Sequence, residues 1–148
     1  MYLLSVSVIA AASIGYELLL MRLMSIIQWH HFAYMIISLA LLGFGASGTF
    51  IILAKQWLLQ KQRFSLWLLA IFFSISSILC FQLVQKIPFN PLEVPWSGLQ
   101  FIYLSINYLI LMIPFFCSAT YVGLVFIIFD KKLEKVYSFD LIGSGVGV

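Results

Sequence analysis

The chain has 148 residues, of which 64% are hydrophobic and 9% charged, and its mean hydropathy is +1.11. A soluble domain of this size cannot bury so much apolar surface, so the composition excludes a soluble globular protein. The apolar runs are long and do not alternate with a period of two, which favours membrane helices over a β-barrel. The net charge of +3 comes from a few lysines and arginines between these runs, which indicates a lipid bilayer as partner and no nucleic acid.

The apolar segments predict an all-α, polytopic transmembrane helix bundle with four full spans and the start of a fifth. The predicted helices cover residues 3–27, 32–54, 64–84, 99–129 and 137–148. The fourth is too long for a straight span, so we expect it to be tilted, to be kinked at Pro114, or to begin at the membrane surface. The fifth rises only ~18 Å against a bilayer core of ~30 Å. We therefore expect residues 1–148 to be the N-terminal transmembrane domain of a longer chain.

Positive charges gather in alternate connections between the predicted helices. Residues 55–63 and 130–135 each contain three lysines or arginines, whereas residues 28–31 contain none and residues 86–98 only Lys86. Because cytoplasmic loops carry the excess of positive charge, the two positive connections are predicted to lie in the cytoplasm. The N-terminus is then cytoplasmic as well.

Glu17 and Arg22 are the charged residues of the first predicted helix. An ionised carboxylate near the middle of a bilayer is costly, so Glu17 must face protein or water, pair, or stay protonated. It is either part of a site for an ion, a proton or a substrate, or a carboxyl that locks the bundle through a hydrogen bond. Arg22 lies ~140° further round the helix and either joins such a site or snorkels to the outer membrane surface.

Four other polar residues complete the candidate substrate-binding set with Glu17 and Arg22: His30, His31, Asn107 and Asp140. The adjacent histidines point to different sides, so we expect an interfacial belt or a ligand contact at the outer mouth rather than a metal site. Asn107 can bond to another helix. Asp140 lies in the first turn of the fifth predicted helix, where a carboxylate is stabilised by the helix N-terminus; a ligand contact is the alternative.

Small residues are concentrated in two of the apolar segments. Gly43, Gly45 and Gly48 match the dinucleotide-binding pattern G-x-G-x-x-G, but the match lies inside an apolar span and not between a strand and a helix. In a membrane helix such residues let a second backbone approach closely. The sequence therefore predicts helix packing at Gly43, Gly45, Ser47, Gly48, Gly143, Gly145 and Gly147.

The chain has no Ser-His-Asp set, paired carboxylates, zinc-ligand spacing or phosphate-binding loop. We therefore predict no catalytic residue, no metal and no cofactor in this part of the chain. Cys80 and Cys117 lie in apolar segments, which predicts buried thiols and no disulfide.

Three segments together resemble a known family: residues 15–23 (GYELLLMRL), 39–48 (LALLGFGASG) and 137–147 (YSFDLIGSGVG). They are similar to the membrane region of bacterial spermidine/spermine synthase-like proteins, which show a "YE…R" first helix, a glycine-rich second helix and a "Y…DLIGAGLG"-like helix entry. The resemblance implies an inner-membrane domain that precedes a cytosolic Rossmann-like, aminopropyltransferase-type domain. Any such activity would then lie beyond Val148, with Glu17, Arg22 and Asp140 as the polar positions in the membrane.

Three functions are consistent with these observations. The first is an anchoring or substrate-handling membrane domain of a spermidine synthase-like protein, in which Glu17 faces a cavity and neutralises a small cationic or amphipathic substrate. The second is a transporter-like bundle for a small cation, followed by further membrane helices. The third is a scaffold subunit, in which the glycine face of the second helix packs against a partner membrane chain.

Overall fold

Four long helices and a shorter fifth make up the protein, and the computed structural model describes residues 2–28, 31–87 and 98–148. The helices are α1 (Tyr2–Gln28), α2 (His31–Gln60), α3 (Gln62–Lys86), α4 (Gly98–Ile128) and α5 (Leu133–Val146), with a 3-10 turn, η2 (Asp130–Lys132), before the last. The predicted all-helical fold is confirmed, and these residues contain no strand.

The first four helices are long and apolar enough to cross a membrane. Many of their large apolar side chains are exposed on the outside of the bundle, such as those of Ile52, Leu53 and Trp67. In water this surface would be unfavourable, but in a bilayer it faces lipid tails of similar polarity. The chain is therefore a membrane protein.

The helices extend further into the charged connections than their hydropathy predicts. Helix α2 continues past the predicted residue 54 to Gln60, and α3 begins at Gln62, so the predicted loop 55–63 is a tight turn at Lys61. The segment contains no glycine or proline, and the buried Leu58 anchors its last turns. Helix α5 likewise starts at Leu133 and not at 137, because Val136 is fully buried against the bundle. Helix α4 remains continuous through the buried Pro114.

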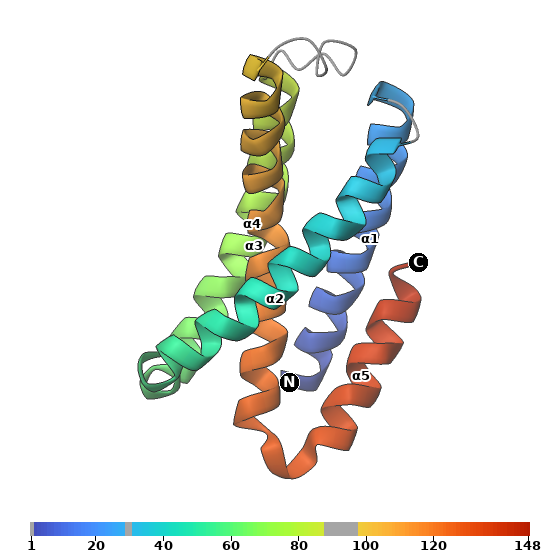
Figure 1. Cartoon of the computed structure of the whole chain (residues 1–148). Helices are drawn as coiled ribbons and strands as arrows, with labels where there is room; N and C mark the ends of the chain where they lie inside the picture. The colour runs from blue at the N-terminus through green and yellow to red at the C-terminus, as the bar shows by residue number, and fades with distance from the viewer. Residues whose placement is uncertain (1, 29–30, 88–97) are drawn as a thin grey trace.

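The helices form two groups that meet in the middle of the molecule (Figure 1). Helix α3 lies beside α4, α2 crosses them obliquely, and α5 lies beside α1. The N-terminus, the α2–α3 turn and the α4–α5 turn lie at the same end of the bundle, the lower end in Figure 1. The two positively charged connections therefore share one end, as the positive-inside pattern requires of a membrane protein.

Two hydrophobic clusters hold the bundle together, one nearer each end. The cluster at the N-terminal end of α1 contains residues such as Val6, Leu58, Leu124 and Val136. The other cluster lies further along α1 and near the start of α2, with Leu20, Ile36, Leu39, Leu111 and Phe115 among its members. Along α1 and α2, a short stretch of smaller residues separates the two clusters.

Some of the predicted packing glycines lie where helix backbones approach closely. A Cβ atom on Gly43 would lie 2.9 Å from Cβ of Phe115 on α4. A Cβ on Gly143 would clash with the backbone of Ser7 on α1, and one on Gly147 with the backbone of Ala11. From the first contact to the second, the position moves four residues forward on α1 and four residues forward on α5, so the two helices are parallel.

The remaining packing residues divide between the inside and the outside of the bundle. Ser47 is buried, one helical turn from Gly43. Gly45, Gly48 and Gly145 are exposed, and a Cβ on any of them would meet no described atom within 4 Å. Small residues four apart therefore mark the helix contacts within the chain, and the glycines between them face outward.

Candidate functional site

A cavity of about 450 Å³ lies between α1, α2, α4 and α5, and we refer to it as the Asp140 cavity. Most of its lining is apolar, with five polar side chains among it: Ser13, Ser47, Ser118, Asp140 and Ser144. A small number of polar groups converging in an apolar hollow is the usual composition of a small-molecule site. The Asp140 cavity is therefore the candidate functional site.

The cavity exists because small residues from four helices meet at one level of the bundle. On α1 and α2 its lining falls between the two hydrophobic clusters, at residues such as Ala10, Ser13 and Ser47. On α4 the small residues Ser118, Ala119 and Gly123 continue it. Larger side chains at these positions would fill the space, as they do in the clusters on either side.

Three of the four serine hydroxyls in the cavity, those of Ser13, Ser47 and Ser118, have already used their protons. Ser118 Oγ donates to the Phe115 carbonyl oxygen at 3.0 Å, so Ser13 Oγ must be the donor in the 3.0 Å bond between the two serines. Ser47 Oγ donates to the Phe44 carbonyl oxygen at 2.7 Å. What these hydroxyls can still offer a ligand is the lone pairs of their oxygens, so they act as hydrogen-bond acceptors.

Asp140 adds a carboxyl group to these acceptors. Its side chain is half-buried, and no donor among the described residues bonds to it. A carboxyl in a mostly apolar membrane cavity is poorly solvated, so it gains from a cationic partner or stays protonated. Together with the serines, it makes the cavity selective for groups that donate hydrogen bonds.

Helix α5 holds Asp140 in position through its contact with α1. Ser7 Oγ donates to the carbonyl oxygen of Phe139 at 2.5 Å, directly before Asp140 in the chain. Gly143 and Gly147 then bring the two backbones together along the next turns. Because backbone packs on backbone here, α5 has little freedom to rotate and carry the carboxyl out of the cavity.

The cavity is elongated along α4. Its lining on that helix runs from Ser118 to Phe126, two helical turns or ~12 Å. Asp140 belongs to the helix that follows the α4–α5 turn, whereas Ser118 and its partner Ser13 lie further from that turn. A ligand with a cationic group and an apolar body would match such an elongated hollow.

Glu17, the residue that the sequence favoured as the cation partner, is not part of this lining. It is half-buried on α1, one helical turn beyond Ser13. Its neighbour Tyr16 packs on Phe115 with ring centroids 5.6 Å apart. Arg22 is exposed and lines a separate hollow beside Ser25 and Gly147.

Among the other predicted site residues, Asn107 does not line the cavity. His31 is the first residue of α2, and His30 lies outside the described residues. Asn107 is buried in α4, with 3% of its surface exposed, and its Oδ1 has no hydrogen-bond partner in the described part of the chain. Cys80 and Cys117 are buried, free thiols, as predicted.

The sequence interpretation missed three of the five polar residues of the cavity: Ser13, Ser118 and Ser144. Each is a single small hydroxyl in an apolar helix, a pattern that also serves ordinary helix packing. The signal that would have found them is positional, because Ser13 and Ser118 are small polar residues near the middle of predicted spans.

The chain matches no family model, and neither a curated protein nor a solved structure shows significant similarity to it. The geometry of the Asp140 cavity and the arrangement of the helices around it are therefore the observations that bear on function.

Proposed function

We propose that this chain is an integral membrane domain that binds a small amphipathic cation in the Asp140 cavity. The observation that carries the proposal is the convergence of one carboxyl group and acceptor hydroxyls inside an apolar hollow between four helices. The carboxylate would neutralise the cation, and the serine oxygens would accept its remaining N–H bonds. In this proposal Asp140 and the serines of the cavity bind a substrate, and they have no catalytic role.

The number of charges limits the ligand. Among the lining residues that the structure describes, Asp140 is the one acidic side chain and none is basic. A single carboxylate balances a single positive charge, so an amine with one charge and an apolar chain fits best. A polyamine would leave further charges in an apolar environment, where each is costly.

The proposal places this domain in a spermidine synthase-like protein of the bacterial inner membrane. The end with the positive connections would face the cytoplasm, together with the N-terminus. Any aminopropyltransferase-type activity would belong to a soluble domain outside these residues. The features that support this context are the three sequence segments described above and the shared end of the two positive connections.

The ligand class can be tested with three probes of similar size: hexylammonium, hexanol and hexanoate. The purified protein in a nonionic detergent is titrated with each, and the shift of its melting temperature is measured. We expect hexylammonium to stabilise the protein, hexanol to do so weakly and hexanoate not at all. Equal stabilisation by all three, or a preference for hexanoate, would contradict a cation site.

A scaffold role is the second candidate, and the exposed glycines of α2 favour it. Gly45 and Gly48 present bare backbone on the outside of the chain, with no described neighbour. A helix of a second membrane chain could approach closely there. A transporter-like role shares the Asp140 cavity with our proposal, and uptake of labelled hexylammonium into proteoliposomes would distinguish it from binding alone.

A further inference from the structure

A second hollow, of about 570 Å³, lies between α1, α3 and α4 at the end of the bundle that carries the positive connections. We refer to it as the Arg63 groove. One side is formed by α3, with Arg63, Leu66, Trp67 and Ala70. Tyr2, Ser5 and Tyr121 complete the lining from α1 and α4.

Along α3, the side chains that line the groove change from charged to apolar. Arg63 is exposed in the first turn of the helix, and Trp67 follows one turn later with 72% of its surface exposed. Leu66 lies between Arg63 and Trp67, and Ala70 lies one turn further along the span. A cation at the end of a span, followed by a tryptophan and aliphatic side chains, suits the interface and the apolar region of a membrane.

Two hydroxyl groups of the groove, those of Ser5 and Tyr121, already donate their protons within the protein. The Tyr121 hydroxyl donates to Ser5 Oγ at 2.7 Å, and Ser5 Oγ donates to the Tyr2 carbonyl oxygen at 2.8 Å. The guanidinium of Arg63 is the charged donor among the described lining residues, none of which is acidic. The groove therefore favours a ligand with an anionic acceptor that can bind Arg63.

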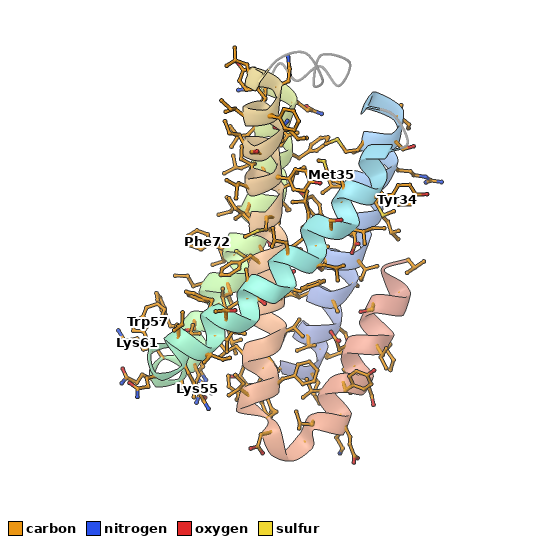
Figure 2. All side chains as sticks on the ribbon, viewed as in Figure 1. Tyr34, Met35, Lys55, Trp57, Lys61 and Phe72 are labelled. Carbon is orange, nitrogen blue, oxygen red and sulfur yellow. The ribbon has the colours of Figure 1, made fainter. Side chains whose placement is uncertain are left out.

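The surrounding charge favours the same ligand. Residues 55–63 contain Lys55, Lys61 and Arg63 without an acidic residue. Figure 2 shows Lys55 and Lys61 together at the α2–α3 turn, beside Trp57. Basic pockets between membrane helices at a positively charged end are suited to the head groups of anionic lipids.

We propose that the Arg63 groove binds an anionic phospholipid, with the phosphate on Arg63 and an acyl chain along Leu66, Trp67 and Ala70. A guanidinium forms two parallel hydrogen bonds with a phosphate, which suits it to this role. This site is independent of the Asp140 cavity: it attracts anions and lies on a different set of helices. If the protein does not bind the lipid, the proposal of a cation site in the Asp140 cavity is unaffected.

The test is native mass spectrometry of the purified protein with dioleoyl-phosphatidylglycerol and with dioleoyl-phosphatidylcholine. The wild type should retain the anionic lipid about fivefold more than the zwitterionic one, the preference that one cation near a membrane surface provides. Arg63→Gln should abolish this preference. Lys55→Gln, which removes an equal charge at the same end but outside the lining, should reduce the preference clearly less than Arg63→Gln does.

A second variant tests the acyl-chain seat without changing charge. Ala70→Phe should fill the apolar part of the groove and reduce retention of phosphatidylglycerol, while helical content measured by circular dichroism stays the same. Millimolar inorganic phosphate should not displace the lipid. Equal effects of Arg63→Gln and Lys55→Gln would overturn the lipid assignment in favour of general charge attraction. Displacement of the lipid by phosphate alone would overturn it in favour of a site for a free anion.

Discussion

Two carboxyl groups lie among the apolar helices of this protein, and their surroundings differ. Asp140 on α5 lines a cavity that it shares with serine hydroxyls from three other helices. Glu17 on α1 is half-buried but lies outside that lining, one helical turn beyond Ser13. The comparison teaches that an acidic residue within a membrane span does not by itself locate a binding site. The size of the residues around it decides whether there is room for a ligand.

Packing explains the difference between the two positions. Near Asp140, the helices meet through serine, alanine and glycine, and space remains between them. Beside Glu17 on α1, Leu20 is 1% exposed and Tyr16 packs against Phe115, and the hollow next to Gly15 and Arg22 does not include Glu17 in its lining. Substitutions that alter the cavity should therefore change ligand binding, and substitutions that leave it intact should not.

Gly143→Leu should disrupt the contact that holds Asp140 in place. The new side chain would meet the backbone of Ser7, which cannot move aside as a side chain would. We expect a loss of at least the ~1–3 kcal/mol that overpacking typically costs, together with loss of hexylammonium binding. Thermal unfolding in a nonionic detergent measures the first effect.

The matched control for Gly143→Leu is Gly145→Leu, because a Cβ at position 145 meets no described atom within 4 Å. It should change the free energy of unfolding by no more than about 0.5 kcal/mol. Equal losses of stability in the two variants would mean that the α1–α5 contact does not depend on the small residue at 143.

Ser13→Ala should have a smaller effect, confined to the Asp140 cavity. It removes the 3.0 Å bond to Ser118 and one acceptor for the ligand. An interhelical hydrogen bond in a membrane contributes ~0.6 kcal/mol on average, so we expect stability to fall by that amount. A loss of the same size in ligand binding would weaken hexylammonium affinity about threefold.

Ser38→Ala is the control for Ser13→Ala. The Ser38 hydroxyl is exposed and bonds only within its own helix, to the Tyr34 carbonyl oxygen at 3.3 Å. Hexylammonium titrations of the two variants should therefore differ, with Ser38→Ala behaving like the wild type. A weakened affinity in both would indicate a general effect of removing hydroxyls from the bundle.

Gly45→Leu should have the smallest effect, because position 45 is exposed and a Cβ there meets no described atom within 4 Å. We expect stability within about 0.5 kcal/mol of the wild type and unchanged hexylammonium affinity. Size-exclusion chromatography of the protein extracted from its native membrane provides the decisive readout. The disappearance of a larger assembly in this variant would favour the scaffold role over ligand binding.

Sequence reasoning predicted the elements of the fold better than their contacts. Hydropathy identified each membrane helix in order, because burial in lipid acts on every residue of a span. It made two helices too short at the charged turns, since α2 continues to Gln60 and α5 begins at Leu133. The spacing of Gly143 and Gly147 is typical of a contact face, but it contains nothing about which helix lies opposite.

The candidate site was the least predictable part for the same reason. Asp140 stood out as a charge at the start of a predicted span, but its cavity is built by Ser13, Ser47 and Ser118, which come from three other helices. Pairing α5 with α1, at opposite ends of the sequence, creates that arrangement. Single serines in apolar helices give no signal of such a long-range contact.

The most direct test of the account compares Asp140→Asn with Glu17→Gln in the same hexylammonium titration. Each variant removes one carboxylate and keeps the size and shape of its side chain. A hydrogen bond to a charged group contributes ~1.5–3 kcal/mol, so Asp140→Asn should weaken binding roughly 10- to 150-fold. Glu17→Gln should change the affinity less than about twofold, the effect of ~0.4 kcal/mol. The reverse result, with Glu17→Gln abolishing binding and Asp140→Asn leaving it intact, would contradict the assignment of the cation to the Asp140 cavity.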